Sequence, residues 1–81
     1  MVNKIISVVL EKRNEEAPSF QEILTKHGCI IKIRLGVHEI EGCANKGLII
    51  LVVHGNQEEV DKLINDLKNE PTVKLNTLDI E

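Results

Sequence analysis

The chain has 81 residues and a mass of 9.1 kDa, the size of one small domain, so we expect residues 1–81 to fold as a single unit. Apolar residues make up 42% of the sequence and charged residues 28%, a balance that excludes a chain disordered throughout. The net charge of −3 and the single aromatic residue, Phe20, exclude the basic patches and stacking platforms of sequence-independent nucleic-acid binders. We therefore expect a globular protein with no direct nucleic-acid partner.

Cysteine usage and hydropathy indicate the compartment. The chain has two cysteines, Cys29 and Cys43, and shows no secretory leader before its first strand-like segment, which favours a reduced, cytoplasmic setting. The longest apolar run, residues 48–53, is far shorter than the ~20 residues that a membrane-spanning helix needs. We expect no membrane partner.

The first two segments differ in periodicity. Residues 4–10 are rich in β-branched side chains and predict a strand that is apolar on both faces. Pro18 is favoured in the first turn of a helix, and apolar residues recur after it every three or four positions until Gly28, a typical helix end. The pattern predicts a helix over residues 18–27.

The next segment, residues 29–37, alternates between apolar and basic side chains, the period of two expected of a half-buried strand. In this interpretation Lys32 and Arg34 point outward. The opposite face, which we expect to face the core, carries the apolar residues Ile31, Ile33, Leu35 and Val37. Residues 38–47 break the pattern with two glycines and an asparagine, which predicts a long hairpin loop.

The second half of the chain repeats the order of strand, helix and strand. Residues 48–53 form a continuous apolar run, which predicts a strand buried on both faces. Asn56 is a favourable N-cap, and Glu59 completes the capping box of a helix with an apolar stripe. Residues 72–80 predict the last strand, with a bulge or an early end because its apolar residues change face.

The order β, α, β, β, α, β predicts a ferredoxin-like fold, an α+β sandwich whose four-stranded antiparallel sheet carries two helices on one face. In this topology the first and third strands are central, which agrees with their two apolar faces. Side chains such as Ile5 and Val9 then lie on the face without helices, where apolar patches mark protein contacts. We expect a homo-oligomer, a dimer or tetramer, with Ile5 and Val9 at its interface.

Polar side chains after the first strand are the candidate ligand site. Arg13, Asn14 and Ser19 lie in or after the loop between the first strand and the first helix, and Arg34 lies on the outward face of the second strand. Such side chains bind small polar ligands through charge-assisted hydrogen bonds. The alternative is that all four are ordinary solvated residues.

Metal binding and catalysis have less support from the residues. His38 and Cys43 flank the predicted hairpin loop and could supply nitrogen and sulfur ligands to a transition metal, which is the alternative function, although their spacing matches no strong metal motif. No nucleophile has an evident base beside it, and no pair of carboxylates suits a cleft. We therefore expect no enzymatic activity and no cofactor.

A longer series of residues resembles a known family and covers residues 4–79. The series consists of Gly28, Ile31, Ile33, Arg34, Gly36, Val37, Gly47, Leu48, Ile49, Val52, Gly55, Glu58, Val60, Leu63, Leu67, Pro71, Val73 and Lys74. It is similar to the iron-only hydrogenase system regulator family, whose short members are ACT-like and related to the C-terminal domain of the nickel-responsive repressor. The resemblance implies a ferredoxin-like regulatory module that oligomerises through its sheets and senses a small effector.

Three departures from the related proteins limit what this resemblance implies. ACT domains that bind amino acids have a glycine in the turn after the first strand, and residues 13–18 lack one. The nickel repressor's domain has several closely spaced histidines, whereas His38 and Cys43 are isolated. We expect no DNA-binding domain beside the module. The resemblance therefore extends neither to amino-acid nor to nickel binding, and direct repression would need a partner.

Overall fold

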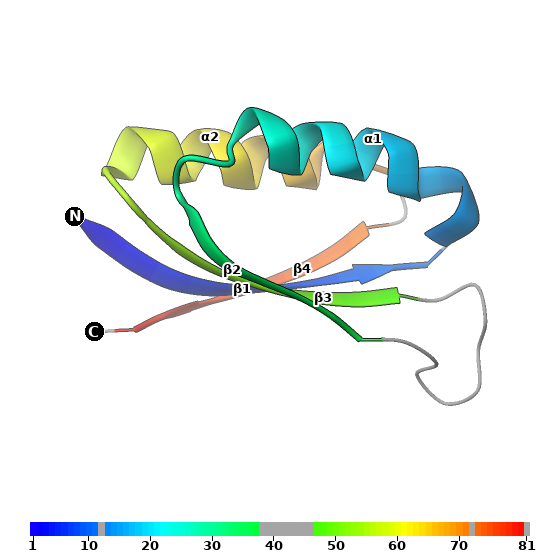
Figure 1. Cartoon of the computed structure of the whole chain (residues 1–81), viewed down its shortest axis with the longest axis horizontal. Coiled ribbons are helices and arrows are strands. Elements are labelled where there is room, and N and C mark those ends of the chain that lie inside the picture. The colour runs from blue at the N-terminus through cyan, green and yellow to red at the C-terminus, as the bar shows by residue number, and fades with distance from the viewer. Residues whose placement is uncertain (12, 38–46, 72, 81) are drawn as a thin grey trace.

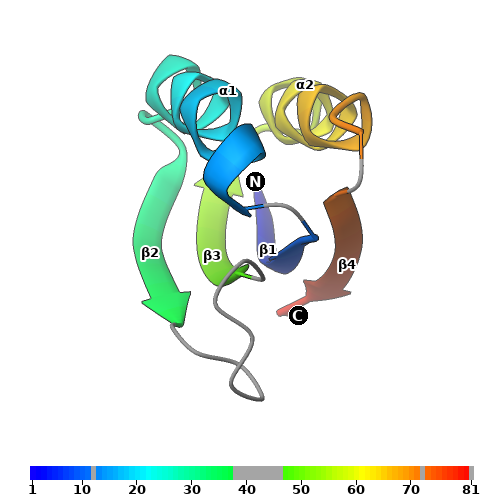
Figure 2. The same cartoon turned by 90° about the vertical axis from the view of Figure 1, so that its right-hand side faces the viewer.

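The computed structural model describes residues 1–11, 13–37, 47–71 and 73–80, with the backbone alone for residues 13–17. The elements in chain order are β1 (Val2–Leu10), α1 (Arg13–Lys26), β2 (Ile31–Val37), β3 (Gly47–Gly55), α2 (Gln57–Lys68) and β4 (Val73–Asp79). Both helices lie on one face of the sheet, and neither of them covers the other face, which we call the open face (Figure 1, Figure 2). The predicted ferredoxin-like βαββαβ architecture is confirmed.

The four strands form one antiparallel sheet in the order β2-β3-β1-β4. The central positions of β1 and β3, which their apolar faces predicted, are confirmed. These two strands pair along their whole length, from Val2 opposite Gly55 to Leu10 opposite Gly47. Because both strands have neighbours on each side, their backbone hydrogen bonds are satisfied within the sheet.

One hydrophobic core lies between the sheet and the two helices. Its buried members are Ile6, Val8, Leu10, Phe20, Leu24, Ile30, Leu51, Val53, Val60, Leu63 and Leu67. Side chains alternate along a strand, so the even-numbered residues of β1 and the odd-numbered residues of β3 face this core. The residues of opposite parity on each central strand face away from the helices.

The strand β2 differs from its prediction because it contains a β-bulge. Between Ile31 and Ile33 the ladder advances two residues on β2 but one on β3, so Lys32 is an extra residue. After the bulge the faces are exchanged, and Ile33 and Leu35 are 57% and 55% exposed on the open face. The expectation that four apolar residues of this strand face the core is therefore wrong for Ile33, Leu35 and Val37.

The last strand, β4, also differs from its prediction. Its register with β1 is continuous, with Val73 opposite Leu10 at one end and Asp79 opposite Lys4 at the other, so the predicted bulge is wrong; the strand ends at Asp79, one residue before the predicted residue 80. Leu75 packs against the core, whereas Leu78 lies on the open face and is 63% exposed. Leu78 lies on the open face beside Ile5 and Val52, an apolar row, so the change of face needs no irregularity in the backbone.

The helix α1 begins at Arg13, five residues before the predicted start at residue 18, and contains Pro18 in its interior. A proline there has no N–H for the carbonyl four residues earlier, and its ring crowds that carbonyl. The first turn of α1 is angled toward the sheet relative to the rest of the helix (Figure 1). The predicted start was wrong because Pro18 lies after a first turn that it bends rather than in that turn.

The helix α2 begins as the sequence predicted. The Asn56 side chain accepts a hydrogen bond from the Glu59 backbone N–H at 2.8 Å, and the Glu59 carboxylate accepts one from the Asn56 backbone N–H at 3.1 Å. This capping box is confirmed, and it satisfies two backbone donors that the helix itself leaves unpaired.

Candidate functional site

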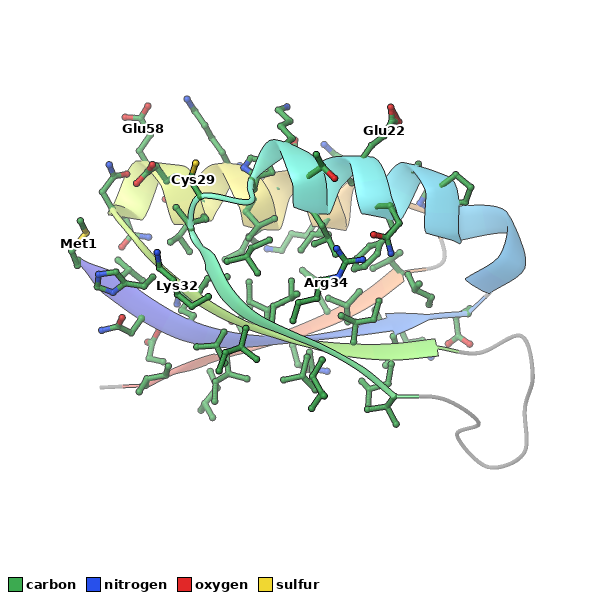
Figure 3. The ribbon with its side chains drawn as sticks, in the orientation of Figure 1. Met1, Glu22, Cys29, Lys32, Arg34 and Glu58 are labelled. Atoms are coloured by element: carbon green, nitrogen blue, oxygen red, sulfur yellow. The ribbon has the colours of Figure 1, made fainter. Side chains whose placement is uncertain are left out.

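The open face of the sheet has a regular pattern of side chains. Cross-strand neighbours in the order β2, β3, β1 and β4 form three rows, which the register aligns across all four strands. The nine apolar positions, which we call the apolar block, are Ile5, Val9, Ile33, Leu35, Val37, Leu48, Ile50, Val52 and Leu78. Side chains of this face project below the sheet, away from the helices (Figure 3).

The remaining three positions of these rows are polar and adjacent to one another. Ser7 lies on β1, and Lys74 and Asn76 lie on β4, next to Val9 and Ser7 respectively. We call these three residues the polar corner. The Lys74 ammonium forms an ion pair with the Glu11 carboxylate at 3.0 Å, so the charge in this corner has a partner. The apolar block itself contains no charged side chain.

The two residues predicted at an oligomer interface both lie in the apolar block. Ile5 pairs with Val52 on one side and Leu78 on the other, and Val9 pairs with Leu48. Their predicted position on the face without helices is confirmed, and both remain partly exposed. The interface itself remains a prediction.

Of the predicted ligand site, the two residues whose side chains the structure describes, Ser19 and Arg34, have separate hydrogen-bond partners. Arg34 lies on the helical side of the sheet rather than the outward face, because the bulge at Lys32 exchanges the faces of β2, and it donates a hydrogen bond to the Gln21 side chain of α1 (Figure 3). Ser19 instead donates to the Glu70 carboxylate, which follows α2. Ser19 therefore joins α1 to the segment after α2, whereas Arg34 joins β2 to α1.

The two remaining predicted ligand residues, Arg13 and Asn14, belong to the first turn of α1, and their side chains lie outside the described part of the structure.

Two concave regions of the surface are lined in part by Ser19 and by Arg34. A groove of about 800 Å³ between α1 and α2 is lined in part by Ser19, and a smaller pocket of about 210 Å³ is lined in part by Arg34. The small pocket has an apolar wall that includes Leu24 of the core.

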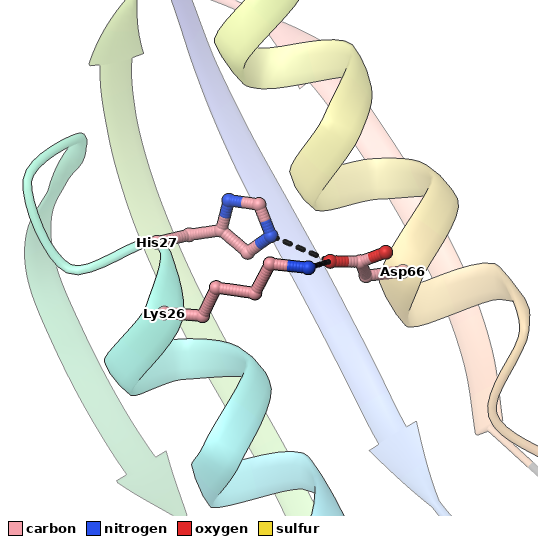
Figure 4. A network of polar contacts seen from close by, with 3 residues as sticks. All are labelled: Lys26, His27 and Asp66. Carbon is pink, nitrogen blue, oxygen red and sulfur yellow. Dashed lines mark hydrogen bonds and ion pairs between the residues drawn. The ribbon is translucent and has the colours of Figure 1, made fainter.

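A polar network that the sequence did not predict joins the two helices. The Asp66 carboxylate of α2 lies 2.7 Å from His27 Nε2 and 3.3 Å from Lys26 Nζ (Figure 4). The hydrogen bond from His27, and then that from Lys26, lower the pKa of Asp66 below its ordinary value of 3.8. The predicted helix over residues 18–27 already ended at His27, but only the packing of α1 beside α2 brings Asp66 close to it.

The two candidate metal ligands, His38 and Cys43, lie outside the residues that the structure describes. Among the residues that the structure does describe, no three His, Cys, Asp or Glu side chains cluster in a way that could hold a metal ion. Cys29 is a free, exposed thiol. Neither α1 nor α2 is long and apolar enough to cross a membrane.

Solved structures of other proteins share this fold. TM1266 from Thermotoga maritima superposes with a TM-score of 0.86 at 21% sequence identity, over 99% of this chain and 98% of that one. CPII from Thiomonas intermedia K12, a nitrogen regulatory PII-like protein bound to ADP, AMP and bicarbonate, superposes with a TM-score of 0.62 at 17% identity, over 100% of this chain and 92% of that one. Its complex with ADP, AMP and acetate gives a TM-score of 0.56 at 17% identity, over 98% and 88% of the two chains.

At the level of sequence, no curated protein matches this chain significantly. One family model matches residues 3–77, which is nearly the whole chain, and the match agrees with the resemblance that the sequence predicted. The chain therefore belongs to the TM1266-like family, whose description is "Iron-only hydrogenase system regulator, putative".

Proposed function

We propose that this protein is a non-catalytic regulatory module that acts as a homo-oligomer and binds a small polar ligand. The observation that carries the proposal is the apolar block on the open face of the sheet. A contiguous apolar area of this kind on a soluble domain marks an interaction surface. The family's description as a regulator supports the regulatory role.

The energetics of the apolar block favour assembly. Ile33, Leu35 and Val37 on the edge strand β2 are 57%, 55% and 36% exposed within one copy. Full burial of such a side chain contributes roughly 1.5–3 kcal/mol, so covering these half-exposed residues would contribute about 1 kcal/mol each. Three residues in each of two copies would then contribute about 6 kcal/mol before the central strands are counted.

The ligand site that we propose is the pocket of about 210 Å³ beside Arg34. A guanidinium has five N–H donors, and the hydrogen-bond partner of Arg34 in the described part of the structure is the neutral Gln21 rather than a carboxylate. This arrangement leaves donors and positive charge for a polar ligand with an acidic group. CPII, which shares the fold, was solved with ADP, AMP and bicarbonate or acetate, and each of these ligands carries such a group.

A ligand screen by thermal unfolding tests the proposal. ADP, AMP, bicarbonate and a panel of common metabolites are added at constant ionic strength, and a ligand at 100 times its dissociation constant should stabilise the protein by about 2.7 kcal/mol. Arg34→Gln should abolish the rise in Tm. Lys68→Gln, which removes an equal charge from the exposed end of α2, should retain it. A panel in which no compound raises Tm would refute ligand binding.

A further inference from the structure

We infer that the pocket beside Arg34 binds a small carboxylate with a short apolar chain, and that Lys32 and Arg34 hold its carboxylate group together. This ligand class rests on the ligand site proposed above and specifies it. A nucleotide such as AMP does not belong to the class, because the pocket is too small to enclose one.

The β-bulge of β2 brings two cationic residues to one pocket. Lys32 is the extra residue of the bulge, and after it Arg34 faces α1. Without the extra residue, regular alternation would place Arg34 on the open face. Both residues line the pocket, together with Leu24, Gly28 and Ile31. Bulges often re-aim a side chain next to a functional site, and this one turns Arg34 toward the pocket that Lys32 also lines.

The positive charges of Lys32 and Arg34 have no carboxylate partner among the described residues. Lys32 donates a hydrogen bond to the Cys29 carbonyl oxygen at 3.2 Å, and Arg34 donates one to the Gln21 side chain, so both acceptors are neutral. By contrast, ion pairs with carboxylates are formed by Lys4, Lys26, Lys62 and Lys74. The chain has 13 acidic and only 10 basic residues, so two neighbouring cations without a carboxylate indicate a place for an anion from solution.

The spacing of the two cations suits a single carboxylate group. Residues two apart on a strand lie about 7 Å apart, and the long side chains of Lys32 and Arg34 can both reach a group between them. A guanidinium has five N–H donors and binds a carboxylate through two of them, and an ammonium has three donors. The bonds to Gln21 and Cys29 therefore leave donors on both side chains.

The walls and the volume of the pocket define the rest of the ligand. Leu24 belongs to the core, and Ile31 packs against it, so both supply an apolar wall that an alkyl chain can cover. Inorganic phosphate and bicarbonate have no such chain. The volume is about 210 Å³, below the roughly 300–1,000 Å³ of pockets that enclose drug-sized molecules. A short-chain carboxylate meets both conditions, whereas a nucleotide does not.

The nearby end of α1 does not oppose an anion. The carbonyl groups of Thr25, His27 and Gly28 accept hydrogen bonds from the backbone N–H groups of Gly28, Ile30 and Ile31, respectively. These bonds reduce the partial negative charge that a helix C-terminus otherwise presents through its unpaired carbonyl groups. The side chains of Lys32 and Arg34 therefore determine the sign of the charge in the pocket.

Titrations followed in two-dimensional NMR spectra of the backbone amides test the ligand class. Acetate, propionate, butyrate and AMP are each added to the wild-type protein at constant pH and ionic strength, with chloride as the reference anion. We expect the carboxylates to shift the signals of residues 28–34, and the dissociation constant to fall about fourfold for each added methylene group. AMP should leave these signals unchanged.

Three variants test the roles of the two cations. Lys32→Gln and Arg34→Gln should each weaken butyrate binding by about tenfold or more, since hydrogen bonds to charged groups are the strong ones. Lys68→Gln is the matched control, because Lys68 is also exposed and has no carboxylate partner among the described residues, but lies beside β4 at the other edge of the sheet. This variant should keep the wild-type affinity to within about twofold. The same spectra show whether each variant is folded.

Each outcome supports or overturns the ligand class. Butyrate binding that depends on both Lys32 and Arg34, without a response to AMP, supports it. Binding of AMP that depends on Arg34 would overturn it, while the proposed ligand site would stand. Butyrate binding that is unchanged in Lys32→Gln, or equally weakened in Lys68→Gln, would also overturn it. No response to any of the four compounds would overturn the ligand class, and the wider thermal screen would then decide whether the proposed ligand site stands.

Discussion

Asp66→Asn should weaken the contact between the two helices, and the size of the effect follows from the geometry of the network. The Asp66 carboxylate is 31% exposed and lies 2.7 Å from a His27 ring that is only 11% exposed. Exposed ion pairs contribute about 0.2–1 kcal/mol, and hydrogen bonds to charged groups about 1.5–3 kcal/mol when buried. A partly exposed network lies between these limits, so we expect a loss of about 1 kcal/mol and a fall in Tm of about 4–8 °C for a domain of this length.

The pH dependence of this effect has a defined sign. The pKa of Asp66 is lowered in the folded protein, so its contribution to stability is complete above the ordinary pKa of 3.8 and is lost as the pH falls through the lowered value. The difference in Tm between the wild type and Asp66→Asn should therefore be complete above pH 3.8 and should shrink as the pH falls below that value.

The assay is thermal unfolding at one fixed protein concentration, because assembly makes Tm depend on concentration. Asp61→Asn is the matched control, since its carboxylate lies on the same helix and is exposed, and it accepts a hydrogen bond from the neutral Gln57 at 2.8 Å. Equal Tm values for Asp66→Asn and Asp61→Asn at about pH 5 would refute the reasoning. A difference that does not shrink as the pH falls below 3.8 would refute the assignment of the effect to the charge of Asp66.

Two further substitutions test the local structure. Gly55→Ala should destabilise the protein by about 1–3 kcal/mol in urea unfolding, because the added Cβ would lie 2.7 Å from Ile30 Cγ2; an unchanged midpoint would show that the core can accommodate it. Asn56→Ala should cost about 1 kcal/mol through the loss of the N-cap of α2, and Asn56→Ser should recover most of that loss. Equal stability of the alanine and serine variants would contradict the capping account.

Sequence patterns predicted those elements in which local and tertiary signals agree. The helix α2 has both a capping box and an apolar stripe, so its start at Gln57 after Asn56 follows from the sequence. The continuous apolar runs of β1 and β3 predicted their central positions, since a strand with neighbours on both sides is the more covered one in a sheet. The order of the elements then determined the fold.

The strand β2 could not be predicted in the same way. Its alternation was correctly interpreted as a strand, but one extra residue at Lys32 decides which face meets the core. That residue is recognised only from the pairing with β3, which a single sequence does not contain. The apolar residues Ile33 and Leu35 therefore belong to the open face, and Arg34 belongs to the helical side, opposite to the prediction.

The candidate ligand residues show the same limit. Ser19 belongs to α1 and Arg34 contacts it from β2. Ser19 donates to Glu70, whereas Arg34 donates to Gln21. The sequence does not say on which side of α1 a polar residue lies, because this depends on where the helix begins, and α1 begins five residues earlier than predicted. The contact between His27 and Asp66 depends likewise on two segments 39 residues apart.

The central claim is that the open face joins copies of this chain, and native mass spectrometry of the wild-type protein tests it most directly. The protein should be purified without added metals or chelators, so that one spectrum reports the number of subunits and the mass of any retained small molecule. We predict a dimer or a higher multiple of the 9.1 kDa chain, with any additional mass being that of a small organic ligand. A bare monomer at micromolar concentration would contradict the claim.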